Sequence, residues 1–397
     1  MTQSDGSAVA RPPRGTRPAN RRQLILCAAT ELFYRKGYPQ VSMREIAEAV
    51  AIGPSALYRH FANKQDLLFA VVADALGVVE AVLDRVLADP TLDPAAQLAQ
   101  TILQHRAIGA LWHSEGRHLT PEGRTRLRHT LRGIGSRLAD LVQRQRSDAD
   151  DATADLLAWC ILAVTTSVAF HNASLPTDRF VALLAELVRA ATNATLPSLQ
   201  PADDHISAHR QSWAPTRREA ILDSAAKLFA RNGFAGVGVE DIGASVGITG
   251  PSVYNHFDAK EDILAAAVNR GRELLHADMH RQVRRAADPR DALRRLLTGY
   301  GDYVLESPES IQLLITETGH LSAADQERVR TAQHEYIAEW IRLLRQVEPQ
   351  LDPVAARIRV QAALSVINDV AATPHLRALG GLDPAVIEVS AAVLGLD

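Results

Sequence analysis

The chain has 397 residues, of which 47% are hydrophobic and 22% are charged, and its formal net charge is −3. This length exceeds one ordinary domain and fits two domains of about 150 to 200 residues, each large enough to bury a core. Aromatic residues make up only 5%, and β-branched runs bounded by turn residues are scarce, so an all-α fold with essentially no β-sheet is expected.

The N-terminal segment carries Arg11, Arg14 and Arg17 among prolines and glycines, without an apolar run. It therefore differs from a secretory signal and predicts either a basic arm that enters a DNA minor groove or a solvated tail. The two cysteines, Cys27 and Cys160, lie far apart in apolar helical patterns without metal-ligand spacing. Buried, reduced thiols in a cytoplasmic protein are expected, with a redox switch as the alternative.

An internal repeat determines the predicted architecture. Residues 21–71 align without a gap to residues 217–267 at an offset of 196, with 20 identities over 51 positions. A weaker match follows between residues 115–120 (EGRHLT) and 317–322 (ETGHLS) at an offset of 202. Two duplicated units are therefore expected. The chain is predicted to begin with a basic arm (1–20). The first copy then consists of an N-terminal domain, called the first head (21–74), and a first C-terminal domain (75–195). A linker (196–216) leads to the second copy, which consists of the second head (217–270) and a second C-terminal domain (271–397).

Each copy of the repeat is predicted to form a helix-turn-helix. In the first copy, an apolar helical period ends at Gly37, for which a left-handed helix C-terminus is expected, as for Gly233 in the second. Ser42 and Glu45 form a capping-box pattern that opens a second helix reaching Val50. After a tight turn, Pro54 begins a third helix of about two turns, which is short enough to lie in a major groove.

The end of the third helix carries the motif YRHF at 58–61 and YNHF at 254–257, each followed by a lysine. This pattern resembles the TetR family of regulators. The resemblance implies that Tyr58 and Tyr254 contact DNA phosphates and that His60 and His256 support that contact. It also implies that Phe61 and Phe257 anchor the core and that Lys64 and Lys260 bind phosphate. The full set of predicted DNA-binding residues is Ser42, Arg44, Gly53, Pro54, Ser55, Ala56, Tyr58, Arg59, His60, Lys64, Thr249, Gly250, Pro251, Ser252, Tyr254, Asn255, His256 and Lys260.

The two heads differ in charge. Residues 21–71 hold seven Arg or Lys against four Asp or Glu, giving +3, whereas residues 217–267 hold five against seven, giving −2. In the second head Gly238 replaces Ser42, which predicts loss of the capping box. Gly243, Gly247 and Gly250 lie in or near its helices, and each is expected to weaken a helix by up to ~1 kcal/mol if it lies in the helix interior. The first head should therefore dominate the affinity for a polyanion.

Non-identical heads on one chain predict an intramolecular pseudodimer that binds a non-palindromic double-stranded DNA operator. Further homodimerisation stays open. The alternative is a regulator or adaptor whose second head no longer binds DNA and serves structural or protein-partner roles. An enzyme is not expected, because no GxSxG, Walker or dinucleotide-binding motif is present.

The C-terminal halves are expected to bind a small effector and to form the dimer bundle, as the family resemblance implies. The uncharged stretch Leu156 to Phe170 is shorter than a membrane span and predicts a buried helix, packed against Val360 to Val370 across a pseudo-twofold axis. No membrane partner, cofactor or metal is expected. Repression is the default in this family.

Polar residues inside these apolar patterns are candidate effector contacts. Glu115 with His118, and Glu317 with His320, are expected on one helix face, either in a pocket or as a structural or hinge contact with the head. The few charges favour an apolar effector. The resemblance to tandem actinobacterial regulators suggests a lipid or sterol-like one. The candidate effector residues are Trp112, Glu115, His118, His171, Tyr300, Tyr303, Glu317, His320 and Asn368.

Overall fold

The computed structural model describes residues 20–106, 109, 111, 115–201 and 216–396, and the chain divides into two compact units, Met1–Ile134 and Gly135–Asp397. The fold is all-α, as predicted. The predicted arm, including Arg11, Arg14 and Arg17, and most of the predicted linker lie outside the described residues.

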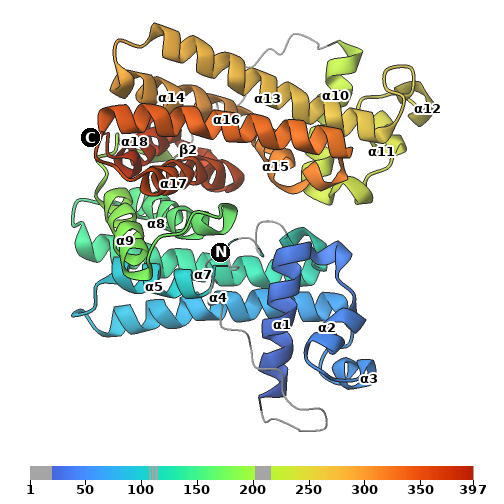
Figure 1. The fold of residues 1–397 in the computed structure, drawn as a ribbon, viewed down its shortest axis with the longest axis horizontal. Coiled ribbons are helices and arrows are strands. Elements are labelled where there is room, and N and C mark those ends of the chain that lie inside the picture. The colour runs from blue at the N-terminus through green and yellow to red at the C-terminus, as the bar shows by residue number, and fades with distance from the viewer. Residues whose placement is uncertain (1–19, 107–108, 110, 112–114, 202–215, 397) are drawn as a thin grey trace, which may run out of the picture. The chain divides into compact units, whose positions relative to one another are not determined.

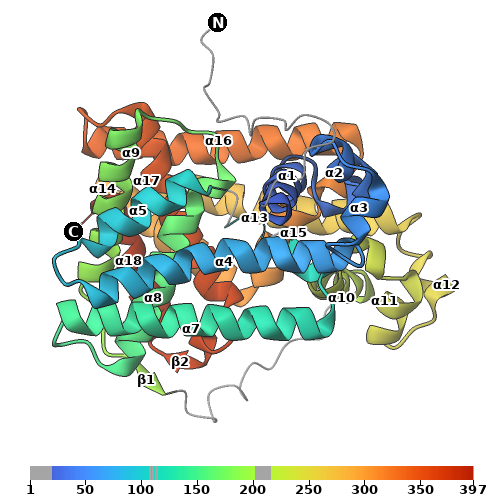
Figure 2. The same ribbon diagram turned by 90° about the horizontal axis from the view of Figure 1, so that it is seen from below.

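The first unit begins with the first head, whose helices α1, α2 and α3 gather near the start of α4 (Figure 1 and Figure 2). Helix α1 buries one face because Ile25, Ala29 and Phe33 recur every four residues. The elements are α1 (Arg21–Lys36), η1 (Tyr38–Gln40), α2 (Met43–Ala49), α3 (Pro54–Tyr58), α4 (Lys64–Ala88), α5 (Pro94–Gln104), η3 (Gly116–His118) and the first part of α7 (Pro121–Gln145).

The second unit contains the rest of α7, two further helices of the first C-terminal domain and the whole second copy. Its elements are α8 (Asp151–Thr166), η4 (Ser167–Phe170), α9 (Thr177–Asn193), β1 (Gln200–Pro201), α10 (Arg217–Asn232), η6 (Phe234–Gly236), α11 (Val239–Ser245), α12 (Gly250–Val253), α13 (Lys260–Arg285), α14 (Pro289–Glu306), α15 (Pro308–Thr316), η7 (Thr318–His320), α16 (Ala323–Val347), α17 (Pro353–Ala372), η8 (Leu376–Ala378), β2 (Leu379–Gly380) and α18 (Leu382–Leu394).

Four helices, two from each copy of the duplicated domain, form the core of the second unit. Helix α8 packs along α17, and α9 packs against α18 (Figure 1). The segment Asp151–Phe170 is long and apolar enough to cross a membrane by composition, but two-thirds of its most apolar window is buried inside the protein. It is therefore the buried helix at a helix interface that the sequence predicts. Because of this packing, residues from Gly135 onward join the second unit instead of staying with residues 75–134.

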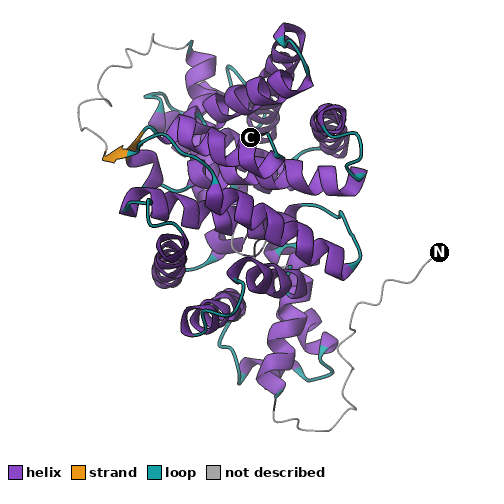
Figure 3. Cartoon of the chain, turned by 90° about the vertical axis from the view of Figure 1, so that its left-hand side faces the viewer, coloured by secondary structure: helices purple, strands orange, loops and turns teal. Residues whose placement is uncertain are grey.

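A pair of two-residue strands accompanies the helices, in keeping with an all-α fold that has essentially no β-sheet. Among the described residues, the sole sheet pairs Gln200 with Gly380 and Pro201 with Leu379, antiparallel (Figure 3). Strand β1 lies in the predicted linker, and Leu199 just before it is buried. The start of the predicted linker is therefore part of the folded second unit. The sequence does not predict this, because a strand of two residues is too short to show a hydrophobic period.

Two local expectations are corrected by the structure. Gly37 and Gly233 have the positive φ that glycine adopts easily, at 77° and 73°, but their ψ of 148° and 154° lies outside the left-handed helical region. Cys27 is exposed, not buried, because it faces away from the apolar stripe of α1. Cys160 is buried as expected, and burial raises the pKa of its thiol.

Candidate DNA-binding interface

The start of α2 is fixed by the predicted capping box in the first head. Ser42 Oγ accepts a hydrogen bond from the Glu45 backbone N–H at 3.1 Å, and Glu45 Oε2 accepts one from the Ser42 backbone N–H at 2.8 Å. Lys36 Nζ lies 2.9 Å from Glu45 Oε1. Together the Ser42 backbone N–H, first, and Lys36, second, lower the pKa of Glu45 to about 2.

The second head keeps half of this cap. Gly238 has no side chain to accept a hydrogen bond, but its backbone N–H donates to Asp241 Oδ2 at 2.8 Å. Asp241 thus takes the role of Glu45. The predicted loss of the capping box is correct for the side-chain hydrogen bond of the N-cap residue but wrong for the bond to its backbone N–H. A shorter carboxylate at the same position still reaches the N-cap backbone.

The turn between the two helices also corrects the expectation for the glycines of the second head. Gly247 has φ +71°, and the equivalent Ala51 has φ +56°, so glycine suits this turn and alanine is the strained residue. At Gly243, a Cβ atom would lie 2.9 Å from the Ile248 carbonyl oxygen and 3.0 Å from the Gly250 backbone nitrogen. Glycine at 243 therefore permits the close approach of α11 to the start of α12.

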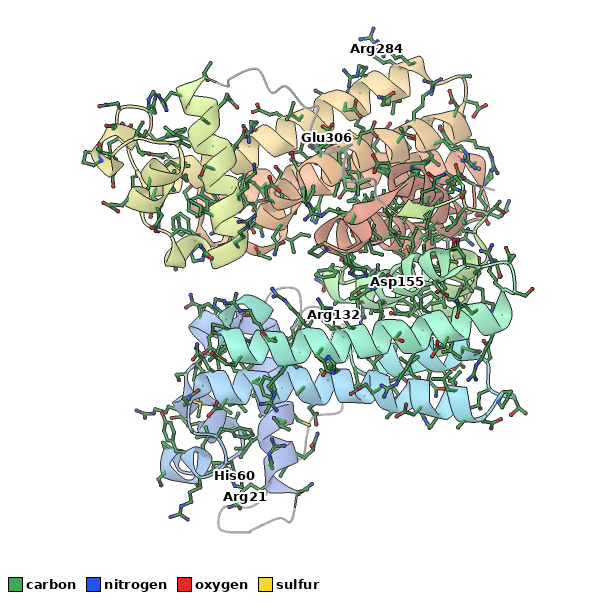
Figure 4. All side chains as sticks on the ribbon, turned by 180° about the vertical axis from the view of Figure 1, so that it is seen from behind. Arg21, His60, Arg132, Asp155, Arg284 and Glu306 are labelled. Carbon is green, nitrogen blue, oxygen red and sulfur yellow. The ribbon has the colours of Figure 1, made fainter. Side chains whose placement is uncertain are left out.

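The recognition helices α3 and α12 present the same kind of face. Leu57 and Val253 are fully buried, whereas Tyr58 and Tyr254 leave 52% and 51% of their surface exposed. An aromatic side chain half in solvent on a short helix is available to a partner. Most predicted contact residues share this exposure, and His60 is seen on the outer surface of the first head (Figure 4). Exposed are Ser42, Arg44, Gly53, Pro54, Ser55, Tyr58, Arg59, His60, Thr249, Pro251, Tyr254, Asn255 and His256; Ala56 and Ser252 are half-buried and Gly250 is buried.

The phenylalanine after each recognition helix anchors it, as the resemblance implies. Phe61 and Phe257 are buried, at 4% and 6% exposed. The guanidinium carbon of Arg22 lies 5.2 Å from the Phe61 ring centroid, and that of Arg218 lies 4.4 Å from Phe257. This cation–π contact ties the first helix of each head to its recognition helix.

The two lysines already have partners inside their own heads. Lys260 Nζ donates to the carbonyl oxygens of Phe234 and Val237, each at 2.9 Å, and lies 4.1 Å from the Phe234 ring centroid. Lys64 Nζ lies 4.1 Å from the Tyr38 ring centroid and 3.4 Å from the Pro39 carbonyl oxygen, and burial lowers the pKa of Lys64. Both lysines therefore hold the loop after the first helix, a role that the sequence does not reveal.

Glu115 and Glu317 contact the heads, which was the hinge alternative of the sequence analysis. Glu115 Oε2 accepts from the Tyr38 backbone N–H at 3.2 Å, and Glu317 Oε2 accepts from the Phe234 backbone N–H at 3.0 Å. Each glutamate precedes a 3₁₀ turn, η3 or η7, so the expected single helix face is wrong. The histidines complete the contact: His118 stacks on Tyr38 at 5.0 Å and His320 on Phe234 at 5.1 Å between ring centroids.

The remaining effector candidates are only partly brought together. Tyr300 donates from its hydroxyl to Asn368 Oδ1 at 2.8 Å, in the core of the second unit. The Tyr303 hydroxyl lies separately, against Gly271, where an added Cβ would come within 2.8 Å of it. His171 follows η4, stacks on Phe180 at 6.5 Å and accepts from the Ala173 backbone N–H at 3.2 Å. Trp112 lies outside the described residues.

An ion network that the sequence did not predict fixes the second head. Arg270 on α13 donates to Glu219 Oε2 at 2.6 Å and to Asp223 Oδ1 at 2.7 Å, both on α10. The equivalent contact in the first head is one hydrogen bond of 3.2 Å from Gln23 to Asp74. An acidic pair four residues apart, matched with an arginine at the equivalent of Asp74, is the sequence signal that could have revealed it.

Comparison with known proteins places the repeat in a family. The profile of "Bacterial regulatory proteins, tetR family" matches residues 25–71 and again 221–267, and "Tetracyclin repressor-like, C-terminal domain" matches residues 286–372. No group of three or more potential metal ligands occurs among the described residues.

Individual relatives agree with this result. The transcriptional repressor NicS of Pseudomonas putida is 29% identical over 32% of the chain and 61% of NicS, and KstR2 of Rhodococcus jostii is 32% identical over 31% of the chain and 57% of KstR2. The chain thus spans about three-fifths of the length of these relatives. The solved KstR2 of Mycobacterium tuberculosis is 22% identical over 46% of the chain and 95% of that protein, with a TM-score of 0.40.

The matched profiles and relatives are those of regulators, not of enzymes. The chain therefore carries two DNA-binding domains of the TetR family of bacterial regulatory proteins in tandem, followed in the second copy by a TetR-type C-terminal domain, and it is similar to transcriptional regulators of that family.

Proposed function

We propose that this regulator is a cytoplasmic repressor that reads a non-palindromic operator with two non-identical heads and is released by a small apolar effector. The observation that carries the proposal is the pair of exposed recognition faces. Tyr58 and Tyr254 are equally exposed, but the next residue is Arg59 in one head and Asn255 in the other. Two heads with the same backbone fold but different residues at the base-contacting position are suited to two half-sites of different sequence.

The packing of the second unit supports an intramolecular pseudodimer. Helices α8 and α9 come from the first copy, whereas α17 and α18 come from the second, and the two pairs bury one another. Two polar contacts join the copies: Arg359 to Glu186 at 2.7 Å and His375 to Asp155 at 3.0 Å. A chain that supplies both sides of this interface needs no second copy to pair its heads.

The domain division proposed for this function follows the sequence prediction. The heads are residues 21–74 and 217–270, and the effector and dimerisation domains are residues 75–195 and 271–397. Helices α4 and α13 run through the boundary between each head and its C-terminal domain, so a movement of either helix is transmitted directly to its head.

An aromatic cluster in the second copy supports an apolar effector. Tyr300 lies 6.3 Å from Tyr336 and 6.4 Å from Trp340 between ring centroids, and all three are buried. Burial raises the pKa of both tyrosines, which therefore stay neutral. With Asn368 as the polar partner of Tyr300, the cluster is an apolar environment with few hydrogen-bonding groups, so a ligand that entered among these side chains would be hydrophobic instead of a sugar or phosphate.

The experiment that tests the proposal compares the two heads on one operator. Because Tyr58 and Tyr254 are exposed, Tyr58→Ala and Tyr254→Ala should leave the fold intact while each weakens binding to a duplex that the wild-type chain selects from a random-sequence pool. A duplex made palindromic from either half-site should bind no more tightly than the selected one. Tighter binding to a palindrome would overturn the two-half-site reading.

The acidic second head favours a second candidate, in which only the first head binds DNA. Its window carries −2, against +3 in the first. If Tyr254→Ala leaves both affinity and salt dependence unchanged while Tyr58→Ala abolishes binding, this candidate replaces the first.

A further inference from the structure

One position on the two heads differs in the sign of its charge. Arg44 and Glu240 are equivalent in the repeat and are each the second residue of their helix, α2 or α11. Both side chains are exposed. Arg44 is paired with Glu48 at 2.8 Å, whereas the equivalent of Glu48 in the second head is Ala244, which carries no charge.

Glu240 places its carboxylate beside the recognition helix. A Cβ atom on Gly250, the first residue of α12, would lie 3.3 Å from Glu240 Oε1, and one on Gly238 would lie 3.1 Å from Glu240 Oε2. The carboxylate therefore lies over the gap between the starts of α11 and α12. Asp241 adds a second carboxylate there, at 3.4 Å from the same point on Gly238, and it is bound to the Gly238 backbone N–H.

The surroundings do not neutralise Glu240. No described side chain makes an ion pair or hydrogen bond with its carboxylate, and its nearest charged neighbour along α11 is Asp241. An exposed, unpaired charge acts over about 10 Å at 0.1 M salt. The carboxylate lies beside Gly250, the first residue of α12, and Tyr254 directly follows this short helix.

We propose that Glu240 is the residue that keeps the second head weaker than the first, by placing a negative charge where the first head presents Arg44. This inference rests on the proposed DNA-binding function of the heads. A carboxylate at the edge of the recognition helix repels the phosphate that an arginine would attract, without altering which bases the helix meets. One residue thereby sets the share of the affinity that the second head contributes.

The test exchanges the charge in both directions in the full-length chain. Glu240→Arg should raise affinity for the selected duplex about threefold to tenfold and make the slope of log K against log salt steeper by about 1. Arg44→Glu should produce the opposite change. Glu240→Gln keeps the size of the side chain and removes only its charge, so it should give part of the gain even if the arginine disturbs packing against Gly250.

The matched control is Glu335→Arg, an exposed position on α16 with the same change of net charge. If this control and Glu240→Arg raise the affinity equally, the gain comes from the net charge of the protein and not from the position of Glu240, and the inference fails. It also fails if Glu240→Arg and Glu240→Gln both leave affinity and slope unchanged. If the wild-type chain enriches no duplex from the pool, the proposed function itself has failed, which is a different outcome.

Discussion

The turn of the helix-turn-helix offers a direct exchange between the two heads. Ala51 holds φ +56°, whereas its counterpart Gly247 holds φ +71° with no heavy atom within 4 Å of where a Cβ would lie. The substitution Gly247→Ala therefore tests backbone strain without a steric clash. Ala51→Gly tests the same strain in the opposite direction.

The magnitude follows from two opposing contributions. Left-handed φ costs an L-residue about 1 to 2 kcal/mol, which Ala51→Gly relieves. Glycine also lowers the free energy of unfolding by about 0.5 to 1 kcal/mol, because it gives the unfolded chain more conformational freedom. We therefore expect Ala51→Gly to stabilise the first head by about 0.5 to 1 kcal/mol and Gly247→Ala to destabilise the second head by a similar amount.

Amide hydrogen exchange followed by mass spectrometry measures each head separately, which a single melting curve of a chain with two units does not. The expected change in free energy corresponds to a change of about twofold to fivefold in the protection factor. Protection should rise in peptides from α1 to α3 for Ala51→Gly and fall in peptides from α10 to α12 for Gly247→Ala. Protection in the unmodified head is the internal control. A fall in protection of the first head on Ala51→Gly would refute the strain argument.

Three further changes test other contacts. Gly243→Ala should cost the second head about 1 to 3 kcal/mol in hydrogen exchange of α10 to α12, because its Cβ meets the Ile248 carbonyl, whereas Ala47→Gly should cost the first head less than that. Glu317→Gln should loosen α10 to α12 in hydrogen exchange by about 1 to 3 kcal/mol, since a buried carboxylate loses its charge-assisted bond to the Phe234 N–H; unchanged exchange would contradict this. Glu45→Gln should lower the melting temperature at neutral pH. The pKa of Glu45 is depressed to about 2, so its contribution is complete above the unfolded pKa near 4.5 and is lost as pH falls toward 2, where variant and wild type should converge.

The heads were predictable because their signals are local and occur twice. The capping residues Ser42 and Glu45, the buried Phe61 and the exposed Tyr58 are each fixed by spacing within one short segment, and the second copy repeats that spacing. The sequence also predicted that the segment starting at Leu156 is a buried helix at a helix interface, because the segment lacks charge and is shorter than a membrane span.

The features that were missed depend on contacts between distant segments. Nothing near Lys260 indicates that its ammonium group binds the carbonyls of Phe234 and Val237, and nothing near Glu317 indicates that its carboxylate reaches a backbone N–H 83 residues away. The effector candidates are polar residues in apolar helical patterns, and a hinge contact and a pocket share this pattern. Only the fold separates Glu317, at the head, from Tyr300, in the core.

The same contacts bear on how an effector would act on DNA binding. Both heads are held to their C-terminal domain by a glutamate carboxylate, but the second is also held by Arg270 across two carboxylates, whereas the first has one hydrogen bond at that place. We therefore expect a shift of α13 to carry the second head with it, whereas at the equivalent place the first head is joined to α4 by a single exposed hydrogen bond. The first head, whose charge is the more favourable one for binding DNA, therefore has the weaker contact at this place. If the proposed release by an effector is correct, we expect the effector to reorient the first head on α4 more readily than the second head on α13 and thereby to change the spacing of the two half-sites.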